Sequence, residues 1–81
     1  MDETQARLVR CFAAAFPLLS SEAILQADAR KIEAWDSIAS VTLFATIEEE
    51  FGIEMDLQAS AELLSFPEIL DYLRSEKGSE S

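Results

Sequence analysis

Apolar residues recur every three or four positions along most of the chain, which is the spacing of amphipathic helices rather than of strands. The clearest case follows Asp36, where the apolar residues fall on two overlapping stripes: Ile38, Val41, Phe44 and Ile47, and Leu43, Ile47 and Phe51. Asp36 or Ser37 begins this helix, and Gly52 offers a left-handed cap at its end. Two stripes exceed one core-facing side, so we expect part of this surface to meet a ligand or partner.

A first helix is predicted over residues 3–16, with Asp2 as its cap and Gln5 as the reciprocal partner. Its buried stripe consists of Leu8, Phe12, Ala15 and Phe16. Pro17 disfavours helical geometry at the preceding residue and ends the helix. The long connection 17–35 should pack on the core through its apolar residues, with a short helical turn at 21–24.

The C-terminal half predicts a short third helix over 57–64 and a fourth that opens with a capping box, Ser65-Phe66-Pro67-Glu68. Phe66, Ile69, Leu70 and Leu73 give this fourth helix one apolar face. The predicted fold is therefore all-α, a four-helix bundle with a long loop between helices 1 and 2. It forms one domain over 1–76, followed by a flexible tail at 77–81.

The charge of the chain is strongly one-sided, with a formal net charge of −10 over 81 residues. No Lys or Arg occurs between Lys31 and Arg74, although ten acidic residues fall there. Such a field repels the phosphates of nucleic acid, so we expect no nucleic-acid partner. The acidic surface is either a solubilising one or a docking field for basic partner proteins, and the sequence leaves both open.

Several chemistries lack their residues in this chain, which has no histidine and only one cysteine, Cys11. A zinc site and a Ser-His or Cys-His nucleophile are therefore not expected. A phosphate-cradling glycine loop is not expected either, since the chain has only two glycines. We predict no enzyme and no metal site, and Cys11 as a small buried apolar residue. No apolar stretch is long enough to span a membrane, and Pro17 with Asp2 and Glu3 argues against a signal peptide. A cytoplasmic monomer is expected.

The dipeptide Asp36-Ser37 stands where chemistry is most plausible. A helix N-terminus presents free backbone N–H groups and the positive end of the helix dipole, which favour a phosphate. A serine in the first helical position directs its hydroxyl outward, to the place where a phosphodiester would be stabilised. The simpler interpretation is that both residues only cap the helix, as Asp and Ser commonly do.

The surrounding motif favours the first interpretation. The stretch Asp36-Ser37-Ile38-Ala39-Ser40-Val41, followed by Ile47-Glu48-Glu49-Glu50-Phe51-Gly52-Ile53, resembles the acyl carrier protein family, of the stand-alone bacterial type. Asp71-Tyr72-Leu73 is similar to the end of that family's fourth helix. The resemblance extends over nearly the whole chain, although the long loop matches poorly.

The resemblance implies that Ser37 carries 4′-phosphopantetheine, transferred from coenzyme A by a separate phosphopantetheinyl transferase that recognises Asp36. The thiol of that arm would hold an acyl group as a thioester and present it to acyl-loading and acyl-transfer enzymes with basic docking surfaces. The interior between the helices would accommodate part of the cargo. The docking face would consist of Ile38, Val41, Phe44, Glu48 and Glu49.

These assignments have alternatives that the sequence leaves open. Ile38 and Val41 fit a core role equally well, whereas Phe44 lies near the stripe edge and favours docking. Trp35 should anchor the loop on the bundle beside Ser37. The lead-in Glu33-Ala34-Trp35 and the uncharged Ala39 and Thr42 depart from fatty-acid carriers and favour a specialised lipid, polyketide or aminoacyl pathway. The alternative function is an unmodified acidic protein-interaction module with the carrier fold.

Overall fold

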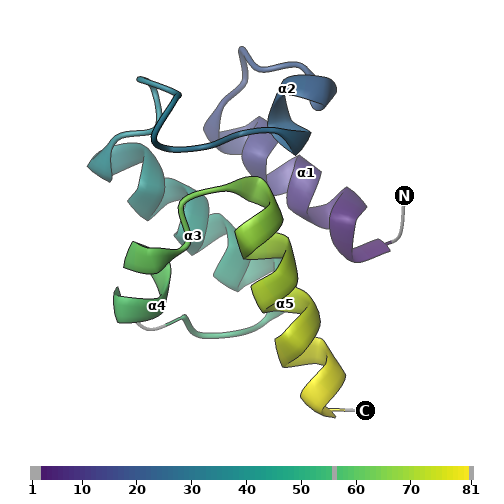
Figure 1. Ribbon diagram of the computed structural model, residues 1–81. Helices are drawn as coiled ribbons and strands as arrows, with labels where there is room; N and C mark the ends of the chain where they lie inside the picture. Colours follow the sequence, from purple (N-terminus) through teal and green to yellow (C-terminus); the bar gives the residue numbers. More distant parts are fainter. Residues whose placement is uncertain (1–2, 56, 81) are drawn as a thin grey trace.

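A computed structural model describes residues 3–55 and 57–80 of the chain. In this part the chain is all-α and contains no β-strand, apart from one isolated antiparallel bridge between Asp28 and Ser65. Its helices are α1 (Glu3–Ala15), α2 (Ser21–Leu25), α3 (Ser37–Phe51), α4 (Leu57–Glu62) and α5 (Phe66–Glu80). Helix α1 packs against both α3 and α5, and Figure 1 shows α2 over one end of α1.

Helix α1 ends one residue before the predicted boundary at Phe16. The amide of Phe16 still donates to the carbonyl oxygen of Phe12 at 2.7 Å, so the last helical hydrogen bond reaches the residue before Pro17. Leu8 and Phe12 are buried as expected, whereas Ala15 is only half-buried. The predicted cap at Asp2 lies outside the described residues.

The long loop between α1 and α3 is packed rather than loose. Its short helix α2 begins at the N-cap Ser20, whose hydroxyl accepts a hydrogen bond from the Ala23 amide at 3.1 Å. This confirms the predicted helical turn. Farther along, the bridge at Asp28 joins the loop to the α4–α5 connection: Ala29 N donates to Leu64 O at 2.7 Å, and Phe66 N donates to Ala27 O at 2.9 Å.

Helix α3 matches its prediction because the signals at both ends are local. Asp36 is the N-cap, and its carboxylate accepts from the Ala39 amide at 2.9 Å. Gly52 adopts φ 64°, the left-handed conformation that residues with a Cβ rarely adopt. The amide of Gly52 and that of Ile53 both donate to the carbonyl oxygen of Glu48, which closes the C-terminal end.

Helices α4 and α5 follow the predicted order with different boundaries. α4 ends at Glu62, two residues before the predicted Leu64. At the start of α5 the Ser65 hydroxyl accepts from the Glu68 amide at 3.3 Å, as a capping box requires. The second hydrogen bond of the predicted capping box, from Ser65 N to the Glu68 side chain, is wrong. The Glu68 carboxylate accepts from Leu64 N at 3.1 Å instead. Helix α5 continues to Glu80, into the predicted tail, whose mobility stays a prediction.

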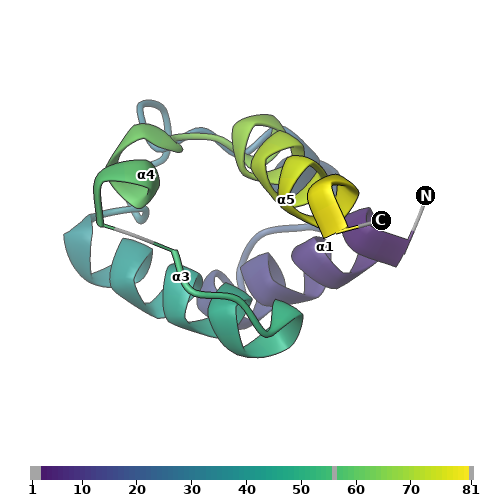
Figure 2. The same ribbon diagram turned by 90° about the horizontal axis from the view of Figure 1, so that it is seen from below.

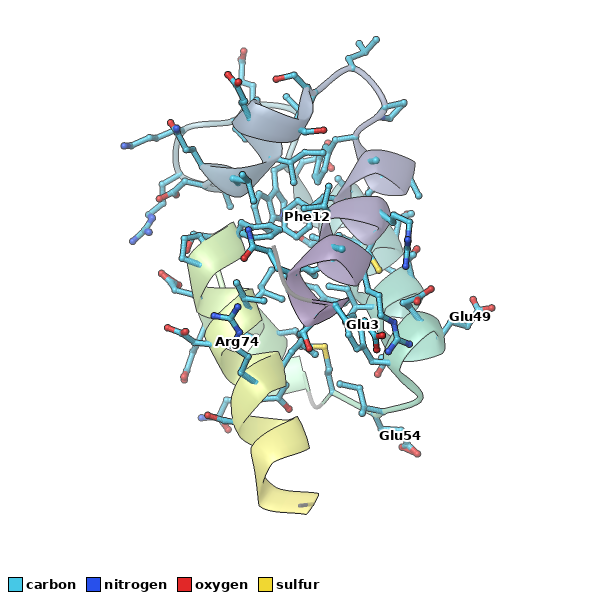
Figure 3. All side chains as sticks on the ribbon, turned by 90° about the vertical axis from the view of Figure 1, so that its right-hand side faces the viewer. Glu3, Phe12, Glu49, Glu54 and Arg74 are labelled. Atoms are coloured by element: carbon cyan, nitrogen blue, oxygen red, sulfur yellow. The ribbon has the colours of Figure 1, made fainter. Side chains whose placement is uncertain are left out.

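The core lies between α1, α3 and α5 and is built around aromatic rings. Phe12 stands at its centre, with ring centroids 5.4 Å from Trp35, 5.2 Å from Phe66 and 6.1 Å from Phe16, and Figure 3 shows it among the helices. The aliphatic side chains that complete the core include Leu8, Ile24, Leu43, Ile47, Ile69 and Leu73. In Figure 2, α4 lies across from α3 at the edge of the bundle, away from α1. A pocket lies between α3 and the segment that includes α4.

Candidate functional site

Ser37 is the first residue of α3 and its side chain is exposed. The chain arrives at Asp36 in an extended conformation, φ −98° and ψ −171°, and turns into the helix at Ser37. The first amides of a helix have no acceptor within the helix, and Asp36 occupies the one at Ala39. The hydroxyl of Ser37 therefore lies at the positive end of the α3 dipole, reachable from solvent.

A pocket of about 450 Å³ opens directly beside Ser37. One wall is a face of α3 that consists of Ser37, Ser40, Val41, Phe44, Ala45 and Glu48. The opposite wall, which we call the α4 wall, consists of Met55, Ser60, Ala61, Leu63 and Leu64. Most of these side chains are small or apolar, with hydroxyls and one carboxylate among them. The pocket can therefore hold an apolar group attached near the N-terminal end of α3.

The structure divides the predicted apolar docking residues into two groups. Ile38 and Val41 are 78% and 70% exposed, so the alternative prediction that these two residues belong to the core is wrong. They stand one helical turn apart and form a small exposed apolar surface beside Ser37. Phe44 is only 9% exposed and belongs to the core, so little of its ring is open to a partner and its place in the docking face stays a prediction. Phe44 also closes the inner side of the pocket.

The three consecutive glutamates on α3 have different surroundings. Glu48 accepts a hydrogen bond from the Met55 amide at 2.8 Å and lines the pocket. Glu49 is exposed, and Figure 3 shows it pointing away from the bundle. Glu50 forms an ion pair with Arg7 of α1 at 2.7 Å. Of the two predicted docking carboxylates, Glu49 is available to a partner, whereas Glu48 is half-buried and bound to the backbone.

Arg7 joins α1 to the C-terminal end of α3, a role that sequence reasoning missed. Its guanidinium donates to both the carboxylate and the carbonyl oxygen of Glu50 and lies 4.7 Å from the centre of the Phe51 ring. The hydrogen bond from Arg7 lowers the pKa of Glu50. Helix carbonyls at a C-terminus lack partners within the helix, so a cation there also complements the dipole.

Trp35 anchors the loop immediately before the site, as predicted. The indole is 5% exposed and packs against Phe12 and Phe16, with ring centroids at 5.4 and 5.7 Å. Its N–H donates to the hydroxyl oxygen of Ser40 at 2.8 Å. Ser40 is thereby fixed in the pocket wall one turn after Ser37.

Sequence reasoning missed Ser40, Ala45 and the inward role of Glu48. A signal for them exists, because the pocket-facing residues of α3 recur at positions i, i+3, i+4, i+7, i+8 and i+11 from Ser37. That spacing marks one face of a helix. The face mixes hydroxyls, a carboxylate and apolar groups, so apolar periodicity alone does not detect it.

In the part of the chain that the structure describes, no three His, Cys, Asp or Glu side chains gather as metal ligands. Among the same residues, no helix has both the length and the apolar content that a membrane crossing requires. No protein-family model, no curated protein and no solved structure matches the chain. The resemblance described above therefore stays a prediction, and the site has to be interpreted from its own geometry.

Proposed function

We propose that this chain is a carrier protein of the acyl carrier type, with 4′-phosphopantetheine attached to Ser37. One observation carries the proposal. Ser37 presents an exposed hydroxyl at the first turn of α3 and also borders a pocket of about 450 Å³. An attachment point for a flexible arm needs the exposure, and a cargo at the end of that arm can use the pocket.

The residues around Ser37 fit the group. A phosphodiester on the hydroxyl would lie near the first-turn amides of α3, where partial positive charge gathers. Asp36 uses its carboxylate to cap the Ala39 amide, so the cap holds the serine at the helix start. When attached, the arm supplies a terminal thiol that binds an acyl group as a thioester.

In this proposal a separate phosphopantetheinyl transferase carries out the attachment step. The Ser37 oxygen attacks the phosphorus of coenzyme A that bears the pantetheine. A phosphodiester forms, the pyrophosphate P–O bond breaks, and adenosine 3′,5′-bisphosphate leaves. The serine proton passes to a base of the transferase. The carrier itself catalyses no step.

The surface around Ser37 fits enzymes that load the acyl group and take it away. Ile38 and Val41 offer an exposed apolar contact, and Glu49 on the same helix offers a free carboxylate. The excess of acidic residues over basic ones, sixteen to six, favours partners with basic docking surfaces. Such complementarity mainly accelerates encounter, which suits a carrier that visits several enzymes in turn.

The finer assignments belong to the same proposal. In it, α1, α3, α4 and α5 correspond to the four helices of the carrier bundle, and α2 lies within the long loop. The domain spans 1–76 and acts as a cytoplasmic monomer in a specialised lipid, polyketide or aminoacyl pathway.

The experiment is intact mass spectrometry after incubation with coenzyme A, magnesium and a phosphopantetheinyl transferase of broad specificity. The expected result is the gain of one phosphopantetheine in the natural chain and none in Ser37→Ala. Ser40→Ala is the matched control, because it removes a hydroxyl one turn away and should still be modified. A folded, previously unmodified chain that gains no mass would overturn the proposal and favour an unmodified acidic interaction module.

A further inference from the structure

Carboxylates from the two neighbouring helices hold the α4 wall at its two ends. At Met55, a Glu48 carboxylate oxygen from α3 accepts the backbone amide at 2.8 Å. At Leu64, a Glu68 carboxylate oxygen from α5 accepts the backbone amide at 3.1 Å. Hydrogen bonds to ionised groups are roughly twice as strong as neutral ones. These two hydrogen bonds therefore help to set the distance between the α4 wall and α3.

The Leu64 end is also bonded to the long loop. The Leu64 carbonyl oxygen also accepts from Ala29 at 2.7 Å, and Phe66 N donates to Ala27 O at 2.9 Å, so several bonds fix that end to the loop. At the other end, the Met55 amide donates a hydrogen bond to the Glu48 carboxylate. Helix α4 has only 6 residues, too few to be stable alone, so its position depends on these end contacts. A change at Glu48 should therefore move the Met55 end and leave the Leu64 end in place.

We infer that Glu48 is a positioning residue that sets the width of the pocket and thereby the length of apolar chain that the pocket accepts. The same side chain lines the pocket and holds its opposite wall at Met55. A shorter side chain at position 48 must either lose the bond to Met55 or draw the wall inward. The consequence for cargo length rests on the proposed carrier function, whereas the pocket geometry does not.

Glu48→Asp and Glu48→Gln separate the reach of the side chain from its charge. Aspartate keeps the charge and withdraws the carboxylate by one methylene, whereas glutamine keeps the reach and an acceptor oxygen. Glu49→Asp and Glu49→Gln are matched controls, because they make the same changes of reach and of charge at a neighbouring side chain that is exposed. Circular dichroism verifies that each variant retains its helices.

Two measurements on the unmodified chain test the inference. Amide hydrogen exchange by NMR reports the bond at Met55, and titration with hexanol, octanol and decanol reports the chain length that the pocket accepts. Neutral alcohols avoid repulsion by the net charge of −10. We expect Glu48→Asp to accelerate Met55 exchange about tenfold or more, the loss expected for one charge-assisted hydrogen bond, with Leu64 exchange unchanged. The ratio of decanol to hexanol affinity should change with it, and Glu48→Gln should lie between Glu48→Asp and the natural chain.

The inference is overturned if Glu48→Asp keeps the natural Met55 exchange and alcohol preference, if Glu49→Asp alters them equally, or if the natural chain binds no alcohol. If Glu48→Asp loses its helices, the comparison of Glu48→Gln with Glu49→Gln decides by the same criteria. Both measurements use the natural chain with Ser37 present and without the arm. A chain that is never phosphopantetheinylated would therefore end the carrier proposal without affecting this result.

Discussion

The indole N–H of Trp35 donates a hydrogen bond of 2.8 Å to the hydroxyl oxygen of Ser40. This bond joins the last turn of the long loop to α3 one helical turn beyond Ser37. Because Trp35 also packs against Phe12 and Phe16, the loop, the core and the wall of the pocket meet at one side chain. The start of α3 is therefore fixed by tertiary packing as well as by its own cap.

Replacing Trp35 should separate the packing from the hydrogen bond. Trp35→Phe keeps an aromatic ring but loses the donor, and we expect a loss of about 1 kcal/mol in the free energy of unfolding, the usual net value of one hydrogen bond. Trp35→Ala also empties the core position and should cost about 3–5 kcal/mol. Urea unfolding measures both. Equal losses of stability in the two variants would contradict a contribution of the packed aromatic ring beyond that of the hydrogen bond.

Ser40→Ala provides the partner for a double-mutant cycle with Trp35→Phe. Alone, it leaves the buried indole N–H without its acceptor, a cost of about 1–3 kcal/mol. In the Trp35→Phe background the same change should cost much less, because no donor remains. Additive losses would show that the two residues act independently.

The local signals of α3 explain why this helix was the most predictable element. Asp36 and Gly52 act within one turn of themselves, so the sequence alone specifies both ends. The burial of Phe44 was less predictable, because the stripe shows only that it lies near an edge. Its burial depends on the side chains that pack around it in the fold, which short-range periodicity does not contain.

The pocket was less predictable than the helix that bears it. Its α4 wall is held by a contact from Glu48 back to Met55, which depends on how the chain turns after Gly52. A run of three glutamates looks uniform in sequence, yet in the fold one lines the pocket, one faces solvent and one pairs with Arg7. Ser37 was identified because its position relative to the helix start is local.

Asp36 has two separable roles, as a helix cap and as a recognition residue for the proposed transferase. Asp36→Ala removes the acceptor of the Ala39 amide and should cost about 1 kcal/mol of stability. Asp36→Asn keeps an oxygen that can cap the helix and removes the charge, so its stability should stay close to that of the natural chain. Urea unfolding and the rate of phosphopantetheine transfer are measured on both variants. A normal transfer rate for Asp36→Asn would show that the carboxylate charge plays no part in recognition.

Acid should weaken the contact between Asp28 and Arg30 within the long loop. The Arg30 side chain and backbone donate hydrogen bonds to its carboxylate and lower its pKa from the ordinary 3.8 to about 2. Because the folded pKa is the lower one, the stabilisation is fully present above about pH 4 and is lost as the pH falls toward about 2. Arg30→Gln removes the main cause of this shift.

We therefore expect Arg30→Gln to lose less stability than the natural chain between about pH 4 and about pH 2. Urea unfolding at several pH values in that range measures the difference. Lys31→Gln is the matched control, because Lys31 is exposed and is the smallest contributor to the shift. If the control flattens the pH dependence as much as Arg30→Gln does, the effect comes from net charge and not from the Asp28–Arg30 contact.

Cys11 should be unreactive in the folded chain. The thiol is buried in the core, and burial, followed by the nearby charge of Glu50, raises its pKa to about 11. Only the thiolate reacts with alkylating and disulfide reagents, so the rate near neutral pH should be limited by unfolding. Cys11→Ala should lose some core packing but leave the fold intact.

This protection makes the proposed arm directly measurable. A chromogenic disulfide reagent should detect no rapidly reacting thiol in the folded, unmodified chain and one in the phosphopantetheinylated chain. It should detect none in Ser37→Ala after the same treatment. Urea should then expose Cys11, the single cysteine, as one further thiol in each sample. A fast thiol in the folded, unmodified chain that disappears in Cys11→Ala would show that the α1 side of the core opens readily. In that case the raised pKa and the packing around Cys11 would not describe the protein in solution.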